Sequence, residues 1–410
     1  MNQRRGAISS LFAVALSMPP AFAAPPRQAS PPDAGDAADF ALTLYRETAA
    51  LKPGKNALVS PFSAREAVGL AYVGARGETA AGLARTLRAA SREDFVASLK
   101  RTRREIQAAD PLTTVESANS LWLRSQWRFL DSYVARAKDG FDAEVFSRDF
   151  SPSVVAEADA WVSRRTHGKI TKAVEELKPD DVAVLLNTVY FKGVWKRPFD
   201  KSKTKDRDFR LASGRSILHP RMAFGLLRPG DLNEFSYFED ADLQAVRLPY
   251  GSGRLAMIVL LPAKTTTLAA IAGKLSGTWW RTLRARMEDR AGEVELPRFK
   301  SRASMRLNDP LIAMGAGAAF DDRADFRDMA EARGPQEMLR ISEVRQEAVV
   351  EVDETGTVAA AKTAVLVARK FVALREPPPF VFIADRPFLF AIEDAASGAL
   401  LFVGSLQDPR

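Results

Sequence analysis

The sequence predicts an α+β fold on the strength of three observations. Helix-type spacing of apolar residues dominates the early part of the chain, in residues 38–51, 78–90 and 93–108. Strand-type runs dominate the later part, in residues 243–248, 254–261, 294–299, 348–352, 388–392 and 400–404. Helices and strands do not alternate regularly, which argues against a parallel doubly wound sheet. The 410 residues, 46% of them hydrophobic, can bury a large core, and we expect one domain over residues 38–410.

Turn residues divide these elements. Pro53-Gly54 ends the first helix, and Ser63 is a candidate N-cap for a second one. Residues 249–253 (Pro-Tyr-Gly-Ser-Gly) and 393–398 separate pairs of strands, so each predicts a hairpin. Two further buried strands are expected at residues 117–124 and 182–190.

Composition excludes several classes of protein. The chain has no cysteine and only two histidines, His167 and His219, so thiolate chemistry is impossible and a His-based site would depend on these two. His167 is expected near a helix end and His219 in a strand or turn, neither with an acidic or serine partner at a catalytic spacing. The formal charge is +8, but basic and acidic residues are interspersed, so we expect no nucleic-acid partner, no metal and no cofactor.

The N-terminus has the pattern of an export signal. Arg4 and Arg5 precede an apolar run over residues 6–18, and Ala21-Phe22-Ala23 supplies small residues for cleavage. The run is too short for a lasting membrane anchor. Residues 1–23 are therefore expected to be a signal peptide, and the Pro- and Ala-rich residues 24–37 a flexible linker.

The most informative pattern follows the strand-like residues 347–352. With period two, one face of the next segment carries mostly small residues, namely Thr357, Ala359, Ala361, Thr363, Val365 and Val367. The other face carries a single charge, Lys362. This alternation is typical of a strand with one buried face, yet the Ala-rich half also suits a helix or an open loop. A segment whose pattern suits a strand, but whose composition also suits a helix or a loop, indicates a part of the chain that changes conformation rather than an active site.

Several blocks, in one order from about Ala38 to Pro409, resemble the serpin family. The N-terminal blocks are residues 56–63 (Asn-Ala-Leu-Val-Ser-Pro-Phe-Ser) and 73–79 (Val-Gly-Ala-Arg-Gly-Glu-Thr). The central block is residues 187–195 (Asn-Thr-Val-Tyr-Phe-Lys-Gly-Val-Trp). Further blocks are residues 248–250, 260–262, 296–299, 324–326 and 385–390, and Glu354-Thr355-Gly356-Thr357 matches the family's hinge.

The resemblance implies a serpin-like α+β fold with three β-sheets, eight or nine helices and an exposed reactive-centre loop at about residues 354–379. It implies a protease inhibitor rather than an enzyme. The target protease cleaves the loop and forms an acyl-enzyme, and the loop then inserts into the large sheet and distorts the protease. The native state of such a protein is metastable. The hinge residues implied are Glu354, Gly356, Thr357, Ala359, Ala360 and Ala361.

The family's usual spacing from the hinge glutamate to the cleaved bond, counted from Glu354, leads to Lys370, followed by Phe371. A cationic Lys370 would suit the acidic pocket of a trypsin-like protease. Arg369-Lys370 is the second candidate bond and Arg375-Glu376 the third. Counting back from the Pro387-Phe388 block leads instead to a position near Glu376, because this loop is longer than the family's common form.

Two further sites follow from the resemblance. Ser60, Ser63 and Asn187 match a polar cluster beneath the opening sheet, where Gln346 replaces the family's histidine. Glutamine donates and accepts hydrogen bonds but cannot titrate, so this cluster would not respond to pH. Ordinary helix capping and core satisfaction are equally compatible with these residues. Trp195 matches the family's buried tryptophan near the top of the sheet.

We therefore expect an exported, bacterial-type serpin, secreted or periplasmic and monomeric, that irreversibly inhibits a serine endopeptidase through a covalent complex. A non-inhibitory serpin that binds or stores a ligand is the alternative within the fold. Inhibition of a papain-like cysteine protease is the alternative within inhibitors. An exported hydrolase would need a nucleophile with a base, which the scarcity of histidine disfavours.

Overall fold

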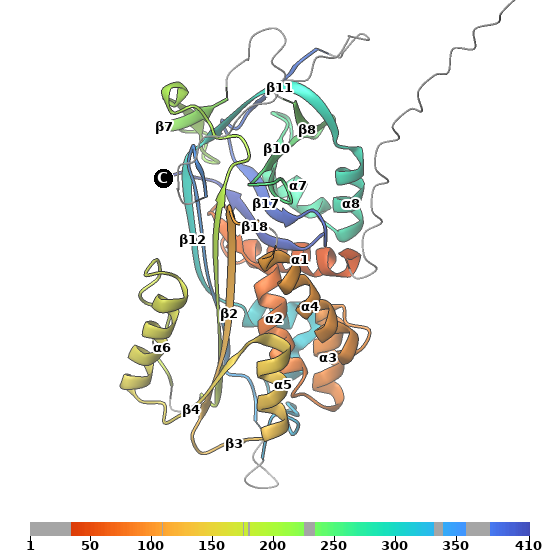
Figure 1. Ribbon diagram of the computed structural model, residues 1–410, viewed down its shortest axis with the longest axis vertical. Coiled ribbons are helices and arrows are strands. Elements are labelled where there is room, and N and C mark those ends of the chain that lie inside the picture. Colours follow the sequence, from red (N-terminus) through yellow and green to blue (C-terminus); the bar gives the residue numbers. More distant parts are fainter. Residues whose placement is uncertain are drawn as a thin grey trace, which may run out of the picture.

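A computed structural model describes residues 34–108, 110–174, 176–178, 181–224, 234–331, 339–357 and 378–410. Within these residues two large sheets are surrounded by nine α-helices (Figure 1). The helices are α1 (Ala34–Ala50), α2 (Pro61–Tyr72), α3 (Gly77–Leu87), α4 (Arg92–Gln107), α5 (Asp131–Phe141), α6 (Pro152–Arg165), α7 (Leu268–Lys274), α8 (Gly277–Arg286) and α9 (Asn308–Leu311). Short 3₁₀ or π turns lie at Lys201–Lys203, Ile312–Ala316 and Gly317–Ala319. No described helix is both long and apolar enough to cross a bilayer.

The first sheet has six strands and forms the long axis of the molecule. Its order is β12 (Phe299–Arg306), β14 (Glu343–Val352), β5 (Ala183–Val194), β2 (Thr113–Arg124) and β4 (Glu144–Arg148), with β15 (Gly356–Thr357) also paired to β5. β14 and β5 are parallel neighbours at its centre. Helix α6 covers one face, and α2, α4 and α5 lie on the other (Figure 1).

Alternation along β5 divides its side chains between these two faces. Val184 and Leu186 pack with Trp161 of α6 in a small apolar cluster. Leu185 and Val189 belong instead to the main core on the α2 side. Both faces are therefore buried, which explains why apolar residues predominate on both faces of β5.

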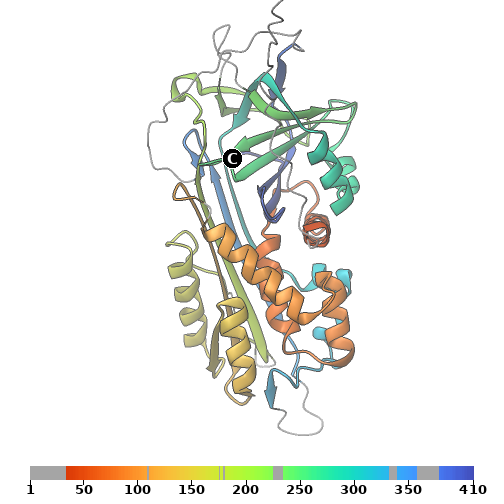
Figure 2. The same ribbon diagram turned by 45° about the vertical axis from the view of Figure 1, so that its right-hand side comes forward.

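The second sheet has ten strands and caps one end of the molecule, together with α7 and α8 (Figure 2). Its strands are β1 (Ala57–Val59), β18 (Leu400–Leu406), β17 (Phe388–Asp394), β10 (Leu255–Pro262), β9 (Leu243–Pro249), β8 (Glu234–Glu239), β11 (Glu288–Pro297), β7 (Ser216–Ala223) and β6 (Lys205–Arg210), with β16 (Phe380–Ile383) paired to β11. A third sheet pairs β13 (Ala330–Glu331) with β3 (Arg128–Phe129). The three sheets and mixed class agree with the sequence prediction.

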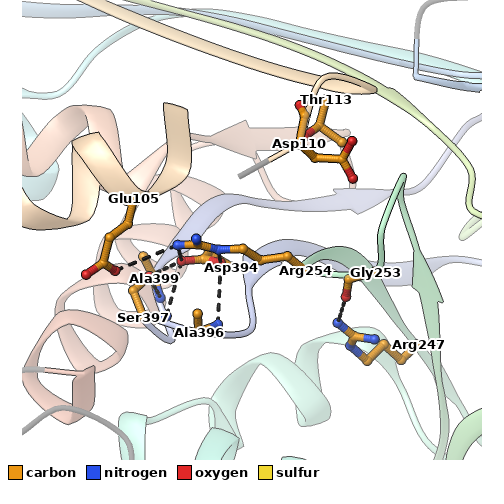
Figure 3. Close-up of polar contacts among 10 residues, drawn as sticks. All are labelled: Glu105, Asp110, Thr113, Arg247, Gly253, Arg254, Asp394, Ala396, Ser397 and Ala399. Carbon is orange, nitrogen blue, oxygen red and sulfur yellow. Dashed lines mark hydrogen bonds and ion pairs between the residues drawn. The ribbon is translucent and has the colours of Figure 1, made fainter. Parts of the chain in front are cut away.

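Both predicted hairpins are present, and an ion pair joins them. Asp394, buried at the end of β17, accepts hydrogen bonds from Arg254 Nε at 2.6 Å and Nη2 at 3.0 Å (Figure 3). It also accepts a bond from the Ser397 hydroxyl in the β17–β18 turn. Burial alone would raise the pKa of Asp394, but these bonds outweigh it and lower the pKa. Arg254 follows the β9–β10 turn, so the two hairpins are fixed to one another.

Several predicted boundaries are wrong. Helix α1 begins at Ala34, so the last four residues of the expected linker, 34–37, belong to an alanine-rich helix. Helix α2 begins at Pro61, a residue suited to a first turn, and its N-cap is Ser60 rather than Ser63. The strand expected at residues 294–299 is the junction between β11 and β12, which lie in different sheets. Residues 1–33, with the proposed signal peptide, lie outside the described part.

Candidate functional site

The hinge after β14 folds back on itself as a tight turn. The backbone N–H of Asp353 donates to the Gly356 carbonyl at 2.9 Å, and the Gly356 N–H donates to the Asp353 carbonyl at 3.3 Å. The Asp353 carboxylate accepts bonds from the backbone N–H of Thr355 and of Gly356. Gly356 has a φ of +145°, and a Cβ there would lie 2.0 Å from the Gly193 carbonyl oxygen, so only glycine fits. The chain therefore leaves β14 and reverses direction within two residues.

After this turn, β15 enters the sheet beside β5. Gly356 pairs with Val194 and Thr357 with Gly193 in antiparallel register, above the point where the β14–β5 pairing ends at Val349. Thr357 is fully buried, and its hydroxyl lies 3.0 Å from the hydroxyl of Tyr250. Burial raises the pKa of Tyr250, so this phenol stays neutral. β15 is thus the first part of an additional strand between β5 and β14.

Glu354, at the tip of the turn, is held by a cation. Its carboxylate accepts a hydrogen bond from Arg298 Nε at 2.8 Å and another from the Thr204 hydroxyl. Burial alone would raise the pKa of Glu354, but these bonds outweigh it and lower the pKa. Its carbonyl accepts from the Phe199 N–H at 2.8 Å. The turn is fixed on both its backbone and its side chain.

Trp195 supports the same turn from below, as expected for a buried tryptophan. It is 2% exposed, and its indole N–H donates to the Asp353 carbonyl at 2.9 Å. The ring stacks on Tyr250 with centroids 4.2 Å apart. Trp195 therefore connects the hinge to the hairpin of β9 and β10.

Lower in the sheet, Gln346 and Asn187 join β14 to β5. The Gln346 amide donates to the Asn187 side-chain oxygen at 2.8 Å and to the Ser60 carbonyl at 2.9 Å. Its own oxygen accepts from the Ser60 N–H at 2.8 Å. Ser60 contributes only its backbone, since its hydroxyl has no partner within the described residues. The expected cluster is present, and any strand that separates β14 from β5 must break it.

The cluster continues into residues that the sequence did not single out. The Asn187 amide donates to the Asn119 oxygen at 2.8 Å and also contacts the Ser63 hydroxyl. Glu66, fully buried on α2, accepts from the Ser117 hydroxyl at 2.6 Å and from Arg103 Nε of α4 at 2.6 Å. The cluster thus reaches from the centre of the sheet to α4.

A signal for these residues exists in the sequence. Ser117 and Asn119 alternate on one face of a strand, and Glu66 interrupts an otherwise apolar helix face. Only the tertiary structure brings Arg103 to them.

The two histidines occupy ordinary structural positions. His167 follows the C-cap of α6, and its Nε2 lies 2.7 Å from the Glu116 carboxylate on the surface. His219, in β7, donates from Nε2 to the Arg298 carbonyl at 2.6 Å. Neither contacts a serine or threonine hydroxyl in these bonds.

The remaining predicted residues lie outside the described part of the chain. They are the hinge residues Ala359, Ala360 and Ala361, and the candidate bonds at Arg369, Lys370, Phe371, Arg375 and Glu376.

Comparison with known proteins establishes the family. The family model Serpin (serine protease inhibitor) matches residues 36–409, so the chain belongs to the serpin family. It is 32% identical to the leukocyte elastase inhibitor of Sus scrofa over 387 residues, which cover 90% of this chain and 97% of the relative.

Two solved structures share the fold. The thermophilic serpin tengpin in the native state superposes with a TM-score of 0.81 at 25% identity, covering 92% of this chain and 94% of tengpin. Human thyroxine-binding globulin complexed with its ligand gives a TM-score of 0.81 at 24% identity, covering 92% and 98%. The latter likeness shows the fold alone.

Proposed function

We propose that this serpin is an irreversible suicide-substrate inhibitor of a serine endopeptidase. The observation that carries the proposal is the hinge, where Thr357 is already paired to β5. This pairing lies at the upper end of the β5–β14 seam, the line along which these two strands pair with each other. A loop that has begun to add a strand needs only to continue in the same register. The leukocyte elastase inhibitor, a relative of similar length, supports the same class of function.

The residues that would enter next have the size that a buried strand requires. Continuing the β15 register along β5 would bring Ala359, Ala361 and Thr363 opposite Phe191, Val189 and Asn187. Directly opposed residues share a face, so these three would point toward α2. A close-packed interior admits such small side chains without displacement of neighbours. Thr363 would meet Asn187 where Gln346 now binds it, so a hydroxyl would replace the amide partner.

The proposed reaction begins as ordinary proteolysis. The serine hydroxyl of the protease attacks the carbonyl carbon at the reactive bond and loses its proton to the protease's histidine. The C–N bond breaks, the new amine takes that proton, and the acyl group stays on the serine as an ester. Insertion of the freed strand then carries the ester-linked protease along the sheet before water can hydrolyse it.

We propose Lys370-Phe371 as the reactive bond, with Arg369-Lys370 as the runner-up, and hence a trypsin-like target. The test is incubation of the purified protein with trypsin, a chymotrypsin-like enzyme and a papain-like enzyme. We expect an SDS-stable complex with trypsin and a released C-terminal peptide whose mass begins at Phe371. Lys370→Ala should abolish the complex, and Arg375→Ala is the matched control that should retain it.

Other outcomes would change the proposal in defined ways. A stable complex with the papain-like enzyme alone would assign a cysteine-protease target. Loop cleavage with no complex against any of the three enzymes would support a non-inhibitory binding or storage role. We also propose export as a monomer, tested by N-terminal sequencing of the mature protein, expected to start at Ala24, and by its mass in solution.

A further inference from the structure

A buried acid lies in the seam that the inserting strand would enter. Glu347 is 2% exposed on β14. Val349, two residues further along and therefore on the same face of the strand, packs with Trp161 of α6, so the Glu347 side chain points away from Gln346 toward α6. The only hydrogen bond of its carboxylate within the described residues comes from the Ser304 hydroxyl of β12, at 2.6 Å. Burial raises the pKa of Glu347 to about 7. A buried carboxylate without a bonded cation is unfavourable when ionised.

The other charges around Glu347 do not supply a bonded cation. Asp159 of α6 adds negative charge and is itself engaged by the backbone N–H groups of Ala173 and Val174. Glu343 adds further negative charge, and Arg345 donates its Nε hydrogen bond to Glu343 at 2.7 Å.

A second polar group beside Glu347 lacks a partner. Thr188 of β5 is the register partner of Glu347 across the seam. It is 1% exposed, and its hydroxyl has no hydrogen-bond partner within the described residues. A buried carboxylate with one hydrogen bond and a buried hydroxyl with none therefore lie on paired residues of the two strands that would separate.

Two separate strand pairings predict the same residue between Glu347 and Thr188 when the loop inserts. Continuing the β15–β5 pairing brings Lys362 opposite Thr188. Continuing the hairpin closed by Asp353 and Gly356 brings Lys362 opposite Glu347. Opposed Cβ atoms on one face lie about 4.5–5.5 Å apart, within reach of a lysine–glutamate pair. Lys362 is the only charged residue between Thr357 and Arg369.

We propose that the Glu347 carboxylate and the Thr188 hydroxyl form a receptor for the Lys362 ammonium, which fills it when the loop inserts. This inference rests on the proposed loop insertion. The pair would stabilise the inserted form specifically, because the native form contains the acid without its cation. It would also fix the register, since a shift by two residues brings an alanine, Ala360 or Ala364, opposite Glu347.

The test compares intact and loop-cleaved protein. Chymotrypsin is used to cleave the loop because its cleavage does not depend on Lys362, the residue that is replaced. The mass of the released peptide locates the cut. Thermal midpoints are measured at pH 8 in a fixed concentration of guanidinium chloride for wild type, Glu347→Gln, Lys362→Gln and the double variant. Glu351→Gln is the matched control, because Glu351 lies on the same strand and face but already pairs with Lys300 and Lys169.

In the cleaved form we expect each single variant to lower the midpoint by about 2–5 °C and the double variant to lower it no further. In the intact form, Glu347→Gln should raise the midpoint and Lys362→Gln should leave it unchanged. Glu351→Gln combined with Lys362→Gln should give additive effects.

Additive effects of Glu347→Gln and Lys362→Gln in the cleaved form would overturn the inference while leaving the proposed function intact, provided cleavage still raises the wild-type midpoint. Absence of any such rise in wild type would overturn both together.

Discussion

The two ends of the β5–β14 seam differ in how far they have opened. At the upper end Thr357 already lies between the strands and bonds to Tyr250. Lower down, backbone pairing and the Gln346–Asn187 bond hold the strands together. The same two strands are therefore open at one end and closed at the other. If the loop inserts as proposed, the sheet would open from the hinge, and the polar cluster would resist that opening.

The largest effect should come from closing the open end. Thr357→Arg would require an arginine in a fully buried position beside Tyr250, and the hinge would be expelled from the sheet. We expect complete loss of the SDS-stable protease complex, with loop cleavage retained. Thr357→Ser, which keeps the hydroxyl, should still trap protease. Trapping by Thr357→Arg would show that this end need not open.

The next largest effect concerns Arg103 of α4, which binds Glu66 at the far end of the polar cluster. Arg103→Met leaves Glu66 buried without its cation, which should cost about 3–5 kcal/mol of unfolding free energy. Chemical denaturation of the native form measures this loss. Lys100→Met on the same helix removes only a surface pair with Asp139 and should leave the free energy of unfolding nearly unchanged. Equal losses would argue that the buried pair is not a special anchor.

A pH effect should come from the α6 side of the seam. The pKa of Glu347 is raised from 4.5 to about 7 in the native fold, so the native form binds its proton more tightly than the unfolded chain. Native stability should therefore be unaffected by this group below about pH 4.5 and fall as pH rises toward 7, by at most about 3 kcal/mol. Denaturation of wild type and Glu347→Gln across this range measures it. Glu347→Gln should lack the part of the fall in stability that is due to this carboxyl. If the stability of wild type and variant changed in parallel with pH, the raised pKa of Glu347 would be contradicted.

A smaller effect should come from the bond that closes the seam. Gln346→Leu removes the partner of Asn187 and of the Ser60 backbone, at a cost of about 1–3 kcal/mol to the native form. Because the weakened seam opens more easily, native protein should also convert faster to a protease-resistant, non-inhibitory form on warming. An unchanged conversion rate would place the resistance elsewhere.

The sequence predicts much of this fold because hydrophobic periodicity is local. The long strand around Asn187 and the helix ending near Gln107 were visible from spacing alone. The start of α2 was misplaced because Ser63 has the chemistry of an N-cap, whereas Pro61 begins the helix and frees the Ser63 hydroxyl for Asn187. The link from Glu66 to Arg103 could not be predicted, since it joins two helices across a fold that no local pattern describes. The pairing of β15 with β5 depends on register, which the sequence does not encode residue by residue.

The two-residue turn between Asp353 and Gly356 fixes the register of any strand that continues from it along the seam. Because the turn fixes which residue faces which, the distance that a bound protease would travel under the proposed mechanism follows from the position of the cut alone. β5 begins at Ala183, and continuation of this register would bring Val367 opposite it. A cut after Lys370 would leave the protease about 10 Å beyond the last rung, whereas a cut near Glu376 would leave it about 30 Å away on a slack tether. Under the proposed mechanism the shorter distance would hold the protease against the end of the sheet, where its catalytic site would be distorted.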